Sequence, residues 1–237
     1  MNYPYYQHRI TFGSGPMTPG VKYLLFTCVG VFLFQSFAPR EILVLFGLIP
    51  YLVWNKYFVW QLGTYIFLHG GLFHLIFNLF ALWMFGCQLE RQWGTKNFVK
   101  YFLVTGIGAG ISYAVVSPGQ LSPVIGASGA IYGILLAYGL IFPNQMIYVW
   151  FLFPIKARYF VIIFGAIELY ASVTGSGGGI AHVAHLGGML FGYLYINYAR
   201  ILRKVYMAYL QYKLRRLRRD IHIVDTKKKR GRKDYIN

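Results

Sequence analysis

The sequence is poor in charged residues, in acidic residues and in cysteine. Only 12% of its 237 residues are charged and only six are Asp or Glu, whereas 57% are hydrophobic. A soluble globular domain carries about 25% charged residues, so this scarcity argues against a water-soluble fold and favours a protein that lies in lipid. The two cysteines, Cys28 and Cys87, fall in apolar stretches. This excludes a disulfide framework and predicts small apolar core residues.

The charge that is present is mostly basic and lies at one end of the chain. The formal net charge is +17, and 14 of the 23 Lys and Arg lie at or after Arg200. Within 201–219, apolar positions such as Leu202 and Leu210 alternate with basic ones, which predicts a helix lying on an anionic inner leaflet. The run KKKRGRK (227–233) is also typical of a nucleic-acid patch. On a membrane protein we expect it to contact lipid and no nucleic acid.

Apolar runs of spanning length recur along the chain. Six spans are predicted, over 21–38, 64–88, 97–117, 126–142, 159–175 and 182–200. The stretch 39–61 carries charges and Pro50, so we expect it to be a loop in the outer interface between the first two spans. The stretch MIYVWFLF (146–153) is too short to cross a bilayer, and we expect a loop there.

The predicted fold class is therefore an all-α polytopic membrane protein with six transmembrane helices. Its expected parts are a short cytoplasmic segment (1–20), a six-helix core (21–200) and a basic cytoplasmic tail (201–237). Basic residues gather in the loops on the side of the termini, at 89–96 and just before 159, and none lies in loops 118–125 and 176–181. The positive-inside rule then places both termini in the cytoplasm. The compact form, with no appended domain or transit segment, favours a bacterial inner membrane.

This orientation brings conspicuous polar residues of three spans to one side of the membrane. His74, Ser128 and His185 all fall in the outer halves of the spans that enter from outside. Polar residues within spans are costly, face the bundle interior and mark candidate functional sites. The three residues are therefore expected to share one depth and one side of the membrane.

Ser128 has two interpretations. It lies among Gly126, Gly129, Ala130 and Gly133, a pattern of small residues that lets membrane helices pack closely. A serine at the start of a helix also lies beside free backbone N–H groups. Those are the components of a nucleophile next to an oxyanion site.

A serine nucleophile needs a base, and AHVAHLGGMLFG (181–192) offers two histidines. Gly188 and Gly192 share roughly one helix face with His185, so close contact with the glycine face around Ser128 would bring that imidazole to the hydroxyl. The structural alternative is a helix–helix hydrogen bond or a position at the membrane interface, and for His182 this alternative is favoured.

His74 and Asn78 lie four residues apart, on one helix face. Both can donate hydrogen bonds, and paired donors suit a developing oxyanion. The alternative is a polar clasp between helices. His69 lies on a different face and is expected to be structural.

A metal site built from the four histidines 69, 74, 182 and 185 is a competing interpretation. No H-E-x-x-H motif is present, and no partner carboxylate is evident. Glu168 is the only acid well inside a predicted span. We therefore expect no metal and no cofactor.

Together the three stretches resemble the rhomboid family of intramembrane serine proteases, over nearly all of 20–200. The residues that carry the resemblance are Gly126-Ala127-Ser128-Gly129, Ala184-His185 with Gly188 and Gly192, and His74-x-x-x-Asn78. Glu90-Arg91 resembles the family's E-R pair, expected to be structural. Gln61 after Trp60 departs from its Trp-Arg pair, which leaves the anchoring of the outer loop open.

The resemblance implies a rhomboid-like bundle and a set of roles. Ser128 would be the nucleophile and His185 the base, in a dyad without a carboxylate. His74, Asn78 and the Ser128 backbone N–H would bind the oxyanion, and Tyr132 would pack on the histidine. Substrates would be transmembrane segments of membrane-anchored proteins, cleaved near the outer surface and admitted near the fifth span and the loop 175–179. Two alternatives remain: an inactive rhomboid-like protein that binds client helices, and a transporter or channel, for which no internal repeat is seen.

Overall fold

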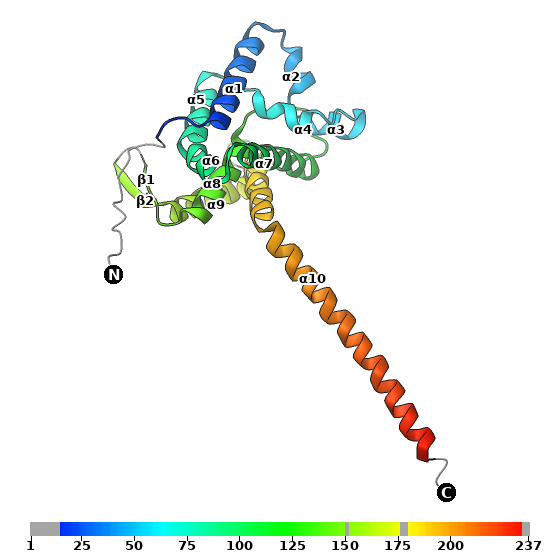
Figure 1. Cartoon of the computed structure of the whole chain (residues 1–237). Coiled ribbons are helices and arrows are strands. Elements are labelled where there is room, and N and C mark those ends of the chain that lie inside the picture. Colours follow the sequence, from blue (N-terminus) through cyan, green and yellow to red (C-terminus); the bar gives the residue numbers. More distant parts are fainter. Residues whose placement is uncertain (1–14, 150–151, 176–179, 234–237) are drawn as a thin grey trace, which may run out of the picture. The chain divides into compact units, whose positions relative to one another are not determined.

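The computed structural model describes residues 15–149, 152–175 and 180–233, and Figure 1 shows their arrangement. Most of the predicted segment 1–20 and of the loop 175–179 lies outside these residues. The helices and strands are α1 (Pro19–Phe37), α2 (Glu41–Phe46), α3 (Pro50–Lys56), α4 (Gln61–Thr64), η1 (Tyr65–Phe67), α5 (Leu72–Ala81), η2 (Leu82–Gly86), α6 (Cys87–Trp93), α7 (Thr95–Val116), α8 (Ser128–Ile141), β1 (Met146–Val149), β2 (Phe153–Lys156), α9 (Ala157–Thr174) and α10 (Ile180–Lys233). The chain divides into two compact units between Tyr195 and Ile196, within α10.

The prediction of a polytopic helical membrane bundle is confirmed. Among the described residues, four helical segments are long and apolar enough to cross a membrane: α1, Leu72–Trp93, α7 and α9. The helix α8 is apolar but has only 14 residues, and the sixth predicted span is the first part of α10. The count of six spans therefore stays a prediction.

The helix α7 is the centre of the bundle. Half of its apolar window is buried, against 22% for α1 and for α9, and it packs against α8, α4 and α1. Its small residues allow close approach: a Cβ added to Gly108 would lie 2.1 Å from Cγ of Phe191, and one on Gly106 would lie 2.5 Å from Cδ1 of Ile66. Packing through small residues is typical of membrane helices. The helices α1 and α9 are left at the periphery, where lipid would cover them.

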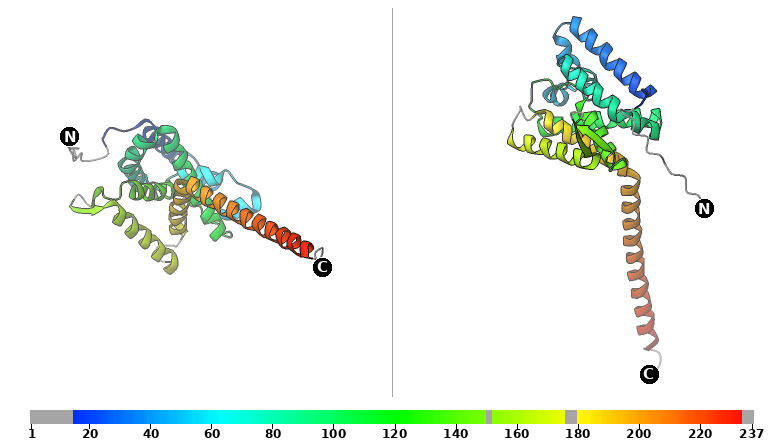
Figure 2. Two further views of the ribbon diagram at one scale, coloured as in Figure 1. Left: turned by 60° about the horizontal axis from the view of Figure 1, so that its bottom comes forward. Right: turned by 90° about the vertical axis from the view of Figure 1, so that its left-hand side faces the viewer.

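Glu90 fixes the start of α1 to α6. Its carboxylate accepts hydrogen bonds from the backbone N–H groups of Gly20 (2.7 Å) and Val21 (2.9 Å) and from the hydroxyls of Thr18 and Thr95. An anion at a helix N-terminus satisfies N–H groups that have no partner within the helix and complements the helix dipole. α1 then runs alongside α5 and η2 (Figure 2). The acid of the predicted E-R pair thus holds two helices together.

The segment expected as an outer loop, 39–61, folds largely into the short helices α2 and α3. Gln61 is fully buried and holds it: its Oε1 accepts from Ile49 N–H (3.0 Å), and its Nε2 donates to the carbonyl of Val44 (2.7 Å). The indole N–H of Trp60 donates to the carbonyl of Leu45 (2.9 Å). The uncharged amide therefore anchors this segment without the arginine of the family pattern, because it supplies both a donor and an acceptor.

The short apolar stretch 146–153 contributes to a hairpin that the all-α expectation did not include. β1 and β2 pair antiparallel, with Met146 opposite Lys156 and Val149 opposite Phe153. Two prolines bracket the stretch, Pro143 before β1 and Pro154 within β2. Because the sheet has only two strands in the part of the chain that the structure describes, Pro154 lies on an edge, where a missing N–H is tolerated.

Candidate active site

Ser128 is the first residue of α8, and the backbone before it is held on two sides. Gly126 donates its N–H to the carbonyl of Tyr65 (2.9 Å), and Val124 exchanges two backbone hydrogen bonds with Leu48 in the segment 39–61. The N–H groups of the first helical turn have no partner within the helix. The serine hydroxyl and these N–H donors therefore lie together at the start of α8, whose position is fixed by the preceding backbone.

Glycines bring α10 into backbone contact with α8. A Cβ added to Gly188 would lie 1.9 Å from the carbonyl oxygen of Gly129, and one on Gly192 would lie 3.4 Å from Cα of Gly133. A Cβ on Gly133 would in turn lie 2.6 Å from the side chain of Thr105 in α7. Only residues without a side chain fit this contact, which sets the separation of the two helices. The predicted helix-packing glycines 129, 133, 188 and 192 all lie at this contact.

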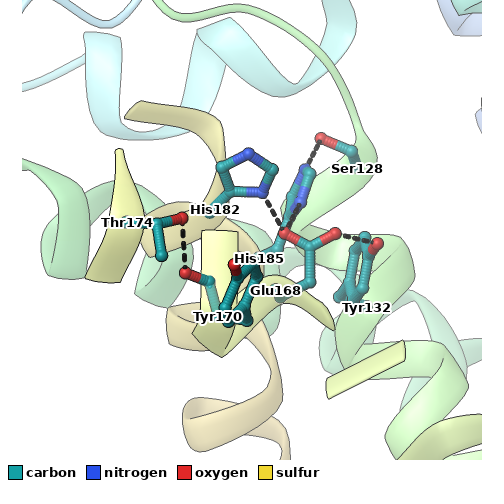
Figure 3. A network of polar contacts seen from close by, with 7 residues as sticks. All are labelled: Ser128, Tyr132, Glu168, Tyr170, Thr174, His182 and His185. Carbon is teal, nitrogen blue, oxygen red and sulfur yellow. Dashed lines mark hydrogen bonds and ion pairs between the residues drawn. The ribbon is translucent and has the colours of Figure 1, made fainter. Parts of the chain in front are cut away.

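At this separation His185 reaches the serine. Its Nε2 lies 2.8 Å from Ser128 Oγ, a hydrogen-bond distance. Tyr132, one turn after Ser128, stacks its ring on the imidazole, with centroids 4.2 Å apart and planes inclined by 12°. Figure 3 shows the histidine between the serine and the tyrosine. The geometry is that of a hydroxyl beside a base whose ring cannot turn freely.

A carboxylate lies on the other side of the histidine, where the sequence analysis expected none. Glu168 of α9 places Oε2 2.9 Å from Nδ1 of His185 and 2.6 Å from Nδ1 of His182. Its Oε1 accepts the hydrogen bond of the Tyr132 hydroxyl. The dyad expected without a carboxylate is therefore corrected to an arrangement of Ser128, His185 and Glu168 in a row (Figure 3). His182, expected as an interfacial residue or a helix–helix hydrogen bond, makes such a bond to α9.

Glu168 was missed because no motif surrounds it. The hydrophobic run of α9 is apolar on all sides, so the sequence does not show which face meets the bundle. One signal was available: Glu168 is the only acid well inside a predicted span, and such residues are paired in the bundle interior. It is buried, with 5% of its surface exposed.

His74 and Asn78 border the same cavity as Ser128. The cavity measures about 170 Å³, and its polar lining includes His74, Asn78, Ser128 and His185. The backbone N–H of Gly70 donates to His74 Nδ1 (3.3 Å), so the neutral ring carries its proton on Nε2. Asn78 donates one amide hydrogen to the carbonyl of His74 (2.7 Å) and keeps a second for another acceptor. Both residues are thus donors at the edge of one cavity.

Gly126 has a different part from the other glycines. It adopts φ +125°, and an added Cβ would lie 2.7 Å from Cε1 of His74. It contacts the His74 ring in α5, so the sequence analysis was wrong to group it with the helix-packing glycines. A residue without a side chain is needed here both for the backbone conformation and for the ring above it.

His69 is not part of the cavity lining, and it marks the true start of the second span. Gln35 of α1 pairs with both backbone groups of His69, accepting its N–H (3.1 Å) and donating to its carbonyl. This pairing holds the chain out of helical conformation, so α5 begins at Leu72 and not near the predicted residue 64. The buried His69 ring lies 5.3 Å from that of His74, and its Nε2 has no hydrogen-bond partner among the described residues. Gln35 was not singled out from the sequence.

Three groups of this site are of the kind that bind metals. The ligand atoms of Glu168, His182 and His185 lie within 4.8 Å of one another, and imidazole with carboxylate is a set that zinc uses. His69 and His74, the other half of the metal interpretation, do not belong to this group. The two imidazole–carboxylate distances are hydrogen-bond distances, so the contacts are accounted for without an ion.

Comparison with known proteins identifies the family of this chain. A family model described as the Rhomboid domain matches residues 56–201, which include every residue of the cavity discussed above. The chain belongs to the rhomboid family. It is 37% identical over 136 residues to the rhomboid protease GluP of Bacillus subtilis, a match that covers 56% of this chain and 25% of the relative.

Two other rhomboid relatives are mitochondrial. The chain is 32% identical over 135 residues to Rhomboid protein 1 of Saccharomyces cerevisiae, covering 54% of this chain and 38% of that protein. It is 34% identical over 140 residues to the presenilin-associated rhomboid-like protein of Rattus norvegicus, covering 57% of this chain and 37% of that protein. The matches thus span well under half the length of these rhomboid relatives.

Proposed function

We propose that this rhomboid is an active intramembrane serine endopeptidase. The observation that carries the proposal is the 2.8 Å contact between Ser128 Oγ and His185 Nε2, beside a cavity that His74 and Asn78 also line. A serine within hydrogen-bond reach of an imidazole nitrogen has the geometry of an activated nucleophile.

The chemistry follows from the positions of these groups. Ser128 Oγ attacks the scissile carbonyl while His185 Nε2 takes its proton, and the imidazolium returns that proton to the leaving amine. His74 Nε2–H, the remaining Asn78 amide hydrogen and the Ser128 backbone N–H donate to the oxyanion. Water then releases the acyl-enzyme. Since a water molecule occupies about 30 Å³ of liquid, the cavity has room for several.

The substrates proposed are transmembrane segments of membrane-anchored proteins. A peptide bond within a helix is protected by its hydrogen bonds, so segments that carry Gly or Pro, which unwind easily, would be preferred. Cleavage near the outer surface follows if both termini are cytoplasmic, as the distribution of Lys and Arg indicates.

The chain is an integral membrane protein, and we place it in a bacterial inner membrane. In the second unit α10 continues through the predicted tail to Lys233. Among its described side chains, Leu202, Val205 and Leu214 are exposed apolar residues. They suit contact with the anionic inner leaflet, with the basic residues of the tail beside lipid headgroups and not nucleic acid.

Labelling with a fluorophosphonate probe tests the activity without knowledge of the substrate. The purified protein in detergent is expected to react at Ser128, and Ser128→Ala and His185→Ala are expected to abolish labelling. Ser36→Ala is a matched control, because this hydroxyl is exposed and donates to the carbonyl of Phe32 in its own helix. Ser36→Ala is expected to label like the parent.

The alternative is a rhomboid that binds client helices without cutting them. Absence of labelling in a folded parent protein would favour this alternative, and so would labelling that survives in Ser128→Ala. Loss of labelling in both variants, with the Ser36→Ala control intact, would support the protease.

A further inference from the structure

The side of His185 that faces away from Ser128 is occupied by Glu168, and the proposed function gives that residue no part. Ser128, His185 and Glu168 come from α8, α10 and α9, and their polar atoms form a continuous row joined at 2.8 and 2.9 Å. We propose that Glu168 is the third member of a Ser–His–Glu triad, a positioning residue that acts on catalysis through His185. This inference rests on the proposed function and deepens it.

The first reason is the tautomer of His185. An ionised carboxylate can only accept hydrogen bonds, so Nδ1 of His185 must carry the proton in its contact with Oε2. The neutral ring then presents an unprotonated Nε2 to Ser128 Oγ, the form that can take the serine proton. Without Glu168 the opposite tautomer becomes available, with a hydrogen on Nε2 that would face the hydroxyl and block its activation.

The second reason is charge. When His185 takes the proton it becomes an imidazolium inside a largely desolvated site, where a charge without a partner is costly. The carboxylate lies at Nδ1 of the same ring, so the cation forms beside an anion that is already in place. Such preorganised charge stabilises a transition state without reorganisation at the moment of reaction.

The third reason is that Glu168 is itself held. Its Oε2 receives two imidazole contacts, from His182 and His185, and its Oε1 receives the Tyr132 hydroxyl. A buried carboxylate with partners on both oxygens is satisfied and keeps one rotamer. The chain order nucleophile, acid, base is one that soluble hydrolases with such triads also use.

The competing explanation is a purely structural clasp, in which Glu168 only holds α8, α9 and α10 together. Two substitutions of Glu168 distinguish this explanation from the triad. Glu168→Gln removes the charge and keeps one acceptor oxygen, whereas Glu168→Met removes the acceptor at similar size. Glu41→Gln is the matched control, since Glu41 is an exposed acid in α2. Each variant is compared with the parent in its rate of fluorophosphonate labelling and in its thermal unfolding midpoint in detergent.

The triad predicts a loss of labelling rate that partial unfolding does not explain. Glu168→Met is expected to label about 10²- to 10⁴-fold more slowly than the parent, as tautomer-disrupting changes in triads do. The labelling rate of Glu168→Gln is expected to lie between those of Glu168→Met and the parent. Glu41→Gln is expected to label at the parental rate. Parental labelling rates in both Glu168 variants would overturn the proposal. A loss of labelling rate that the unfolded fraction at the labelling temperature fully accounts for would also overturn it.

Nitrogen-15 NMR of isotope-labelled histidine gives a second readout, which reports the tautomer of His185 directly and independently of the labelling rate. The parent is expected to show His185 with Nδ1 protonated and Nε2 unprotonated, assigned by its absence in His185→Ala. Glu168→Met is expected to gain the Nε2–H form, and an unchanged tautomer would contradict the proposal. This measurement needs no activity. If the parent fails to label yet shows the Nδ1–H form, the protease is wrong while the Glu168 contact stands.

Treatment with a chelator separates hydrogen bonding from metal binding at the same three residues. The parent is expected to keep its labelling rate after EDTA and dialysis. A loss on chelation that Zn²⁺ reverses would overturn the triad, because the ion and not the Nδ1 proton would then lie against Oε2.

Discussion

Tyr132 contacts His185 twice, once directly and once through Glu168. Its ring lies on the imidazole at 4.2 Å, nearly parallel, while its hydroxyl donates to the carboxylate oxygen that His185 does not use. One side chain from the helix of the proposed nucleophile therefore fixes both the plane of the His185 ring and the orientation of the Glu168 carboxylate. The tyrosine that the family resemblance assigned to packing also has a polar part that the sequence did not indicate.

These two contacts can be separated by substitution. Tyr132→Phe keeps the stack and removes the hydroxyl, and it is expected to slow fluorophosphonate labelling by about 10-fold, because a hydrogen bond to a charged group contributes about 1.5–3 kcal/mol. Tyr132→Ala removes both contacts and is expected to slow it much further. Tyr138→Phe, which deletes another hydroxyl of α8, one that contacts Gln88 of α6, is the control. Equal rates for Tyr132→Phe and the parent would show that the hydroxyl does not orient Glu168.

The contact between α8 and α10 predicts a steep penalty at Gly188. A Cβ there would lie 1.9 Å from a backbone oxygen, which cannot rotate away, so Gly188→Ala must separate the helices. Overpacking of this kind costs about 1–3 kcal/mol, and we expect both a lower unfolding midpoint and slower labelling as His185 moves from Ser128. Gly30→Ala serves as the control, because a Cβ at Gly30 meets nothing within 4 Å. A Gly188→Ala protein as stable and reactive as Gly30→Ala would refute the close contact.

Much of the bundle was predictable because its helices carry their own signals. Long apolar runs gave α1, α7 and α9 within a few residues, and the glycine spacing after His185 gave the face that meets α8. The start of α5 was not predictable in the same way. It depends on Gln35, a side chain 34 residues away that binds the backbone of His69. The hairpin of β1 and β2 depends likewise on pairing between segments that no local periodicity reveals.

The residues of the candidate site divide in the same way, into those that a local motif indicates and those that only tertiary packing brings together. Ser128, His185, His74 and Asn78 could be predicted because each lies in a short motif with fixed spacing, and all four line one cavity. Glu168 lies in no motif, and its place beside His185 arises only when α9 packs against α8 and α10. The grouping of Gly126 with packing glycines was wrong for a related reason, since a small residue looks the same in sequence whether it faces a helix or an imidazole.

Gly126 therefore offers a test of the His74 side of the cavity. Gly126→Ala must relieve a positive φ and a Cβ that would lie 2.7 Å from the His74 ring. We expect the ring to move, the oxyanion donor to be misplaced and labelling to slow by about 10²-fold, the usual cost of losing one such donor. Gly71→Ala is the matched change, since nothing lies within 4 Å of a Cβ at that nearby position. If Gly126→Ala reacts as fast as Gly71→Ala, then His74 does not serve the oxyanion.

Glu90 provides the opposite case, an acid that is expected to matter for stability alone. It lies at the junction of α6 with the start of α1, and it is not among the residues that line the Ser128 cavity. Glu90→Ala leaves the N–H groups of Gly20 and Val21 and the Thr18 hydroxyl without their acceptor. Because an unsatisfied buried polar group costs about 1–3 kcal/mol, we expect a lower unfolding midpoint in detergent.

The labelling rate of Glu90→Ala, measured at low temperature and corrected for the folded fraction, should nevertheless equal that of the parent. Glu41→Ala removes an exposed acid of the same charge and should leave both quantities unchanged. A slower rate at full folding would mean that α1 positions the proposed catalytic residues through α5, since Gln35 of α1 holds the backbone of His69 just before that helix. In that case Gln35→Ala should slow labelling in the same way, and the two substitutions together should cost less than the sum of their separate effects.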